Sequence, residues 1–169
     1  MDVVKELNAK WQQRYQGLAR LQFSHWTPWR QRNRLSSIDK VGVYILAKYE
    51  PNDEIPAYVD PLDNHVIYFG KTNVGRTTSL RNRLNQFDGA AFGSGAPHAG
   101  GYNYKQIFGT NQDGLHVSIC PVYWDYENSN PVLDEAGEFL TKKVITCLET
   151  CLRGVYVYSW GNLPKCNKE

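Results

Sequence analysis

Apolar residues recur at steps of three and four in two long segments of the chain. In residues 3–22 these positions are Val4, Leu7, Trp11, Tyr15 and Leu18. In residues 134–153 they are Leu140, Val144, Cys147, Leu148, Cys151 and Leu152. This spacing gathers apolar side chains on one face of an α-helix. We therefore predict amphipathic helices over both segments.

Three shorter segments combine β-branched and aromatic residues and are bounded by turn-forming residues. They are 41–49 (VGVYILAKY), 66–70 (VIYFG) and 115–124 (LHVSICPVYW). Such runs are typical of β-strands. Pro121 cannot donate to a strand ladder, so it predicts an edge position or a bulge in the third strand.

One further helix is predicted between the second and third strands. It begins near Ser79, whose side chain can accept a free amide hydrogen of the first turn. Its buried side carries Leu80, Leu84 and Phe87. The flanking segments 50–65, with three prolines, and 88–104, rich in Gly and Ala, are predicted to be loops.

The order strand, strand, helix, strand, helix predicts an α+β fold. We expect a small, mostly antiparallel three-stranded sheet flanked by helices. Residues 1–40 would form a basic, aromatic, helical extension, and residues 41–169 would form the main domain. A chain of 169 residues with 41% hydrophobic and 21% charged residues suits this size and class.

Positive charge is concentrated in the first forty residues. That segment holds eight Lys or Arg against three acidic residues, although the net charge of the whole chain is only +2. Its basic residues alternate with aromatic ones, a pattern that suits binding to a phosphate backbone. A solvated helix face beside core aromatics explains the pattern equally well.

Neither a membrane span nor a secretion signal is expected, because no run of 18 apolar residues occurs and the N-terminus lacks the layout of a leader. We expect a cytoplasmic protein with reduced cysteines. No CxxC pair or neighbouring histidine completes a zinc site. We expect buried, apolar roles for Cys120, Cys147, Cys151 and Cys166.

Three features carry candidate chemistry. Tyr44 and Tyr68 each lie near a strand glycine, which marks a close approach of backbone or ligand, or else two ordinary core tyrosines. Arg83 borders an apolar helix stripe and needs an anion, either a phosphate or a structural carboxylate. Glu149 interrupts the uncharged run VITCLETCL near the predicted end of its helix, where the helix dipole disfavours negative charge. A cation such as magnesium would explain it, and so would plain exposure.

Together these residues resemble the GIY-YIG nuclease superfamily. GVY (42–44) and YFG (68–70) are similar to its two motifs, and Lys71 follows as its basic residue. The matching arginine helix, metal-binding glutamate and near-terminal asparagine are Arg83 in LRNRL, Glu149, and Asn167 in LPKCN. The resemblance covers residues 41–169. It implies hydrolysis of DNA phosphodiesters with one Mg²⁺ or Mn²⁺ ion per active site, held by Glu149.

The resemblance also implies roles for the side chains. Tyr44 would position or deprotonate the attacking water, with its pKa lowered by Lys71 or Arg83. Lys71 and Arg83 would stabilise charge on the phosphoryl oxygens. Tyr68 would hydrogen-bond to water or phosphate, and Asn167 would tie the tail to the wall of the site.

Two departures from the family pattern bear on its interpretation. Tyr44 and Tyr68 are 24 positions apart, which favours restriction-type members, with repair, phage or homing nucleases and a non-cutting DNA-binding module as alternatives. Phe87 stands where the family has Tyr or His, so His98 is a candidate replacement, or else a plain loop histidine.

Double-stranded DNA is the expected partner of such an enzyme. The expected DNA contacts are Arg30, Arg32, Arg34, Arg76 and Arg81. Because one site cuts one strand, a homodimer is expected on specific DNA.

Overall fold

The computed structural model describes residues 2–12, 20–73, 79–93, 95–123 and 134–168. Its centre is a four-stranded antiparallel sheet with the strand order β1-β4-β2-β3. The strands are β1 (Thr27–Pro28), β2 (Gly42–Lys48), β3 (Val66–Lys71) and β4 (Leu115–Pro121). The α+β class and three predicted strands are confirmed, and the two-residue β1 adds a fourth.

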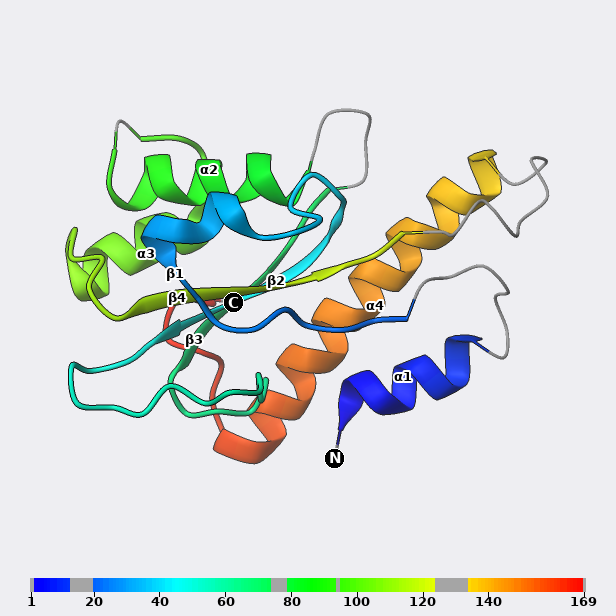
Figure 1. The fold of residues 1–169 in the computed structure, drawn as a ribbon, viewed down its shortest axis with the longest axis horizontal. Helices are drawn as coiled ribbons and strands as arrows, with labels where there is room; N and C mark the ends of the chain where they lie inside the picture. The colour runs from blue at the N-terminus through cyan, green and yellow to red at the C-terminus, as the bar shows by residue number, and fades with distance from the viewer. Residues whose placement is uncertain (1, 13–19, 74–78, 94, 124–133, 169) are drawn as a thin grey trace.

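Helices cover both faces of this sheet (Figure 1). One face carries α2 (Leu80–Ala91), α3 (Ala99–Phe108) and the 3₁₀ helix η1 (Trp29–Arg34). The other carries α4 (Asp134–Trp160) and α1 (Val3–Gln12). Ser79 caps α2 as predicted, since its side chain accepts a hydrogen bond from the Asn82 amide.

Alternate residues of β2 contribute to two apolar clusters, one on each face of the sheet. Val43, Ile45 and Ala47 belong to the apolar cluster under α4 and α1, whereas Tyr44 and Leu46 belong to the cluster under α2 and α3. Successive side chains of a strand point to opposite faces, so a sheet covered on both sides needs apolar residues at every position.

The first forty residues contribute to both clusters. Trp11 and Trp26 lie in the cluster with α4, and Trp29 and Ile38 lie in the cluster with α2. The three tryptophans of this basic segment are therefore core side chains.

The predicted helix over 3–22 is wrong at its C-terminal end. Its described helical part stops at Gln12, and residues 20–26 have no helical structure. Leu21 instead bonds through its backbone N–H and C=O to the side chain of Asn8, at 2.7 Å each. Ser24 donates its backbone N–H to Ile119 of β4. Contacts with α1 and the sheet thus replace the helix that periodicity predicted.

The loop predicted over 88–104 is also wrong, because α3 begins within it. A Cβ at Gly101 would lie 2.6 Å from the Ala90 Cβ and 2.7 Å from the Phe87 carbonyl oxygen. The glycines of this segment therefore let α3 pack closely on α2. They do not mark a loose connection.

The last helix is longer than predicted, ending at Trp160 instead of residue 153. Cys120 and Cys166 are buried as expected, but Cys147 is exposed and Cys151 is half-buried, so the prediction is wrong for this pair. The apolar stripe of α4, which includes both of these cysteines, is therefore wider than the buried face of the helix. Within the described residues, no helix has the length and apolar character needed to cross a membrane.

Candidate active site

Two tyrosines predicted from the motifs share one face of the sheet. In the register of β2 and β3, Tyr44 pairs with Gly70 and Leu46 pairs with Tyr68, so the tyrosines are diagonal neighbours. Their ring centroids are 5.8 Å apart. Both rings face the cluster under α2 and α3.

The glycines of both motifs are required by close approach. A Cβ at Gly70 would lie 2.3 Å from Cζ of Tyr44, because the tyrosine ring crosses directly over this residue. A Cβ at Gly42 would lie 2.3 Å from the Cys120 carbonyl oxygen. The contact of Gly70 with Tyr44 is therefore a packing requirement of the site, whereas Gly42 is required by the close approach of β4.

His98 completes the group of aromatic side chains. It is only 2% exposed, and its Nε2 lies 2.7 Å from the Tyr44 hydroxyl. Its Nδ1 accepts a hydrogen bond from the Gly101 amide at 3.2 Å, which caps α3. Burial, helped by the nearby Arg83 charge, lowers the pKa of His98 to about 3. The imidazole is therefore neutral near pH 7.

The expected lowering of the Tyr44 pKa is not found. Burial raises the pKa of Tyr44 well above its ordinary value, and the charge of Arg83, which acts in the opposite direction, does not outweigh it. The pKa of Tyr68 is also raised by burial, with Arg83 again opposing the shift. Both side chains are therefore phenols, and hydrogen bonding is the chemistry they offer at neutral pH.

Arg83, on α2, lies within electrostatic reach of both tyrosines, since its charge acts to lower both of their pKa values. Its Nη1 donates to Oε1 of Gln86 at 2.7 Å, while its buried Nε has no hydrogen-bond partner in the described structure. No ion pair joins Arg83 to a carboxylate among the described residues. The sequence left two anionic partners open for Arg83, a phosphate and a structural carboxylate. No such carboxylate is found among the described residues.

Glu149 enters the site from α4, 13% exposed in its side chain. Its Oε2 lies 3.2 Å from Nζ of Lys71, and its Oε1 lies 3.8 Å from Nη1 of Arg153. Because α4 continues to Trp160, Glu149 is not near a helix end, and the helix-dipole argument for a cation is wrong. The cations that neutralise it here are Lys71 and Arg153.

The sequence interpretation missed Arg153. It follows Glu149 by four residues, the spacing that brings helix side chains together, so the ion pair was visible in principle. Its charge also acts to lower the pKa of Tyr68, which places it within electrostatic reach of the tyrosines. Arg153 therefore adds a third cation to Lys71 and Arg83.

A divalent metal would have one protein ligand at this site. No three metal-binding side chains come together anywhere in the described parts of the chain. Mg²⁺ commonly binds through one or two carboxylates and keeps several waters. The hard oxygens of a partly open Glu149 fit such a hydrated ion, which would compete with Lys71 for Oε2.

Asn167 holds the C-terminal tail on the outer edge of β3. Its side-chain oxygen accepts from the Phe69 amide at 2.7 Å, and its side-chain nitrogen donates to the Phe69 carbonyl at 2.9 Å. One residue earlier, Cys166 donates its amide to Ile67. The tail thus provides hydrogen-bond partners for backbone groups on the outer edge of β3, the strand that carries Tyr68.

Two expected DNA-binding arginines are already engaged within the fold. Arg32 stacks over the Trp29 ring at 4.6 Å and pairs with Asp88 at 3.1 Å, with 14% of its side chain exposed. Its role is structural, because burial and an ion pair remove it from the surface. Arg81 donates two hydrogen bonds to the carboxylate of Asp39.

The other three differ in how accessible they are. Arg34 is exposed, and Arg30 forms an exposed ion pair with Asp113 at 3.3 Å. Such exposed pairs are weak and exchange readily with other anions. Arg76 lies outside the described residues.

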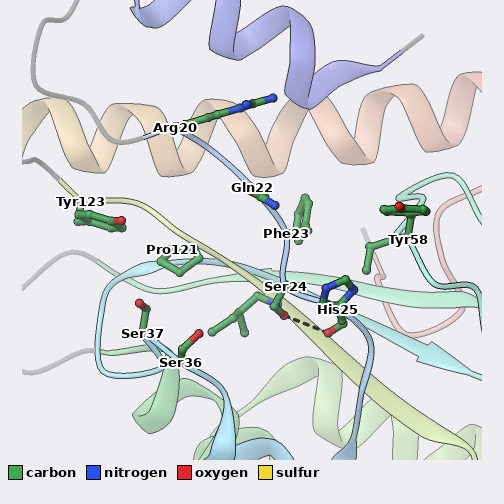
Figure 2. A pocket seen from close by; sticks show the side chains of 12 residues that line it. Arg20, Gln22, Phe23, Ser24, His25, Ser36, Ser37, Tyr58, Pro121 and Tyr123 are labelled. Atoms are coloured by element: carbon green, nitrogen blue, oxygen red, sulfur yellow. Dashed lines mark hydrogen bonds between the residues drawn. The ribbon is translucent and has the colours of Figure 1, made fainter.

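A hollow of about 320 Å³ lies beside β4, and neither Tyr44 nor Tyr68 lines it (Figure 2). Figure 2 shows Tyr58 and Tyr123 on opposite sides of it, with Phe23 and His25 between them. It has no carboxylate in its lining. It forms where the N-terminal segment meets the insert between β2 and β3, and it offers aromatic and polar contacts without hydrolytic chemistry.

The structure thus brings Tyr44, Tyr68, Lys71, Arg83 and Glu149 together and adds His98 and Arg153. The contacts of Arg30, Arg32 and Arg81 are with other residues. The grouping joins side chains from two strands and from helices on both faces of the sheet. No family model, no curated protein and no solved structure matches this chain.

Proposed function

We propose that this protein is a metal-dependent endonuclease of the GIY-YIG type that hydrolyses DNA phosphodiester bonds. The observation that carries the proposal is the meeting of the two motif tyrosines with Arg83 and Glu149. Core tyrosines alone need no guanidinium beside them, and Arg83 has no carboxylate partner among the described residues, whereas Arg32, whose buried Nε is likewise unpaired, has Asp88. A phosphate oxygen would supply the missing acceptor.

The charges of the site suit a phosphodiester. Lys71, Arg83 and Arg153 contribute three positive charges around the single carboxylate of Glu149. An excess of fixed positive charge in a partly buried site favours the anionic substrate. It favours the more highly charged transition state still more.

Individual side chains then have distinct tasks. Arg83 offers a planar fork of donors to two phosphoryl oxygens, and Lys71 offers a point charge. The tyrosine hydroxyls orient water or a phosphate oxygen by hydrogen bonding. Glu149 would hold Mg²⁺ or Mn²⁺, which when bound supplies charge to a phosphoryl oxygen and the leaving oxygen.

We further propose a site-specific, restriction-type role. The hollow beside β4 joins the N-terminal segment to the insert between β2 and β3, and it carries Tyr58, which is 83% exposed. Exposed aromatic rings next to Arg20 suit contacts with bases and phosphates. Two copies of the chain on a palindromic duplex would cut both strands.

A plasmid-cleavage assay with and without magnesium tests the proposal. Cleavage should require the ion, and Glu149→Gln should abolish it while DNA binding measured in calcium survives. The matched control is Glu6→Gln, which makes the same change at an exposed position on α1. Cleavage by Glu149→Gln at the wild-type rate would refute the metal assignment. Nicks alone, by one protomer per duplex, would favour a repair or homing role.

A further inference from the structure

The sequence HAGG (98–101) seats His98 between the two tyrosines of the site. A Cβ at Gly100 would lie 2.4 Å from the ring of Tyr68, so this glycine lets the start of α3 touch the tyrosine directly. The imidazole centroid of His98 lies 5.8 Å from the ring centroid of Tyr68 and 6.5 Å from that of Tyr44. The motif therefore fixes the position of His98 by backbone packing.

The helix cap also fixes which nitrogen of His98 carries the proton. The Gly101 amide can only donate, so Nδ1 must accept and has no hydrogen of its own. In a neutral imidazole the hydrogen is then on Nε2. Nε2–H lies 2.7 Å from the Tyr44 hydroxyl and must donate to its oxygen.

The direction of this bond fixes how Tyr44 is held. Since the Tyr44 oxygen accepts from His98, the bond ties the Tyr44 hydroxyl to the start of α3. Tyr68 is the diagonal neighbour of Tyr44, with ring centroids 5.8 Å apart. The fixed bond therefore runs from His98 to Tyr44, with Tyr68 beside it.

Tyr68 is the outer of the two tyrosines. Tyr44 is fully buried and bonded to His98, whereas Tyr68 is 9% exposed. The charges of Arg83 and Arg153 both act on Tyr68. Of the two hydroxyls, that of Tyr68 is therefore the one that a ligand beside these cations can reach.

We propose that Tyr68 is the tyrosine that hydrogen-bonds to the phosphodiester, and that His98 is a positioning residue, which holds Tyr44 beside Tyr68 without exchanging protons. This inference rests on the proposed nuclease function for the identity of the ligand. The direction of the His98–Tyr44 hydrogen bond does not depend on that function.

The tautomer of His98 can be measured without any activity. Nitrogen-15 NMR of histidine-labelled protein distinguishes an imidazole with hydrogen on Nε2 from the other tautomer and from the cation. We expect the neutral Nε2–H form of His98 throughout the neutral pH range. Hydrogen on Nδ1, or a protonated ring at neutral pH, would overturn the proposed direction. If no cleavage is ever found, this measurement still tests the direction of the His98–Tyr44 hydrogen bond.

Two substitutions separate the cap from the contact with Tyr44. His98→Asn places an amide oxygen where Nδ1 stands, so it keeps the cap and loses the donor to Tyr44. His98→Gln places an amide nitrogen where Nε2 stands, so it keeps the donor and loses the cap. We expect His98→Asn to fold normally and lose about tenfold in kcat, and His98→Gln to be less stable but closer to wild type in kcat. The opposite ranking of kcat would refute the positioning role.

The tyrosines themselves give the final comparison. Tyr68→Phe should lower kcat more than Tyr44→Phe, because it removes the group that touches the substrate. In the Tyr44→Phe background, His98→Asn should have little further effect, since both changes remove the same His98–Tyr44 hydrogen bond. A larger loss for Tyr44→Phe than for Tyr68→Phe would show that Tyr44 meets the substrate and would overturn the proposal.

Discussion

Replacing Gly70 by alanine should displace Tyr44 from its place in the site. The added methyl carbon would lie 2.3 Å from Cζ, 2.5 Å from the hydroxyl oxygen and 2.6 Å from Cε1 of this ring. Carbon atoms in good contact are about 3.5–4.0 Å apart. The ring must therefore move by about 1 Å or more. Its hydroxyl lies only 2.7 Å from Nε2 of His98, so that hydrogen bond would not survive the shift.

The cost has a structural and a functional part. Forcing an extra methyl group into a close-packed core destabilises a protein by about 1–3 kcal/mol. For a chain of this size, each kcal/mol lowers the melting temperature by about 2–4 °C. A displacement of about 1 Å in the side chains that support a reacting geometry can cost about a hundredfold in rate. We therefore expect Gly70→Ala to lose more activity than its stability loss would explain.

Gly154→Ala is the matched control. Gly154 lies inside α4, and a Cβ there would have no atom within 4 Å. The same chemical change should stabilise the protein by about 0.5–1 kcal/mol, because alanine is the better helix former. Thermal unfolding and plasmid cleavage should be measured for both variants. A Gly70→Ala protein with wild-type melting temperature and cleavage would show that the Tyr44 ring does not lie over this residue.

Three further predictions follow from individual contacts. Arg83→Ala should reduce the cleavage rate by a large factor, and Arg83→Lys should not restore it, since a point charge cannot replace a planar fork; equal activity of the lysine variant would reduce Arg83 to a source of positive potential. Arg32→Ala should lower the melting temperature, because it removes an ion pair and a ring contact. Arg34→Ala should leave stability unchanged but flatten the slope of log DNA affinity against log salt concentration. An unchanged slope would exclude Arg34 from the DNA interface. Because burial holds the pKa of His98 at about 3 against an ordinary 6.5, its contribution to stability is complete above pH 6.5 and is lost as the pH falls toward 3. Urea unfolding across that range should show a shallower dependence on pH for His98→Asn than for wild type, and identical curves would contradict the buried, neutral state.

The long strands could be predicted because burial on both faces leaves a continuous apolar run. Residues 42–48, 66–71 and 115–121 all carry this signal. β1 could not be predicted, because Thr27 and Pro28 are too few to show any period and a proline usually indicates a break. It pairs with β4 only because the chain on either side is held there by tertiary contacts.

The helix α3 was missed because its composition argues against a helix. Gly100 and Gly101 are poor helix formers, yet both are buried where no larger residue would fit against Tyr68 and α2. Packing outweighed propensity, and no single-sequence pattern reports which glycines are there for close approach. The His98 cap was missed for the same reason, since a cap is recognised only once its helix is predicted.

The tyrosines and Arg83 were identified through the order of the motifs, and the structure brings them together. Glu149 was predicted as a site residue from a wrong premise, because α4 does not end near it. Glu149 lies at the site because it is on the side of α4 that faces Lys71. Arg153 lies on the same side of α4. It was missed because an acidic and a basic residue four positions apart are an ordinary feature of helix surfaces.

The alternation of β3 explains why this site lies at the edge of the sheet. Tyr68 and Gly70 point to the face under α2 and α3, whereas Phe69 and Lys71 point to the face under α4. The tyrosines with Arg83 and the carboxylate with its cations therefore start on opposite faces, and they can meet only around an edge strand. β3 is such a strand, with no strand beyond it in the described sheet. Within the described residues, the tail occupies its edge through Cys166 and Asn167, whose bonds reach as far as Phe69. Under the proposed nuclease function, the end of β3 at Lys71, beyond these bonds, is where a phosphodiester would reach side chains from both faces.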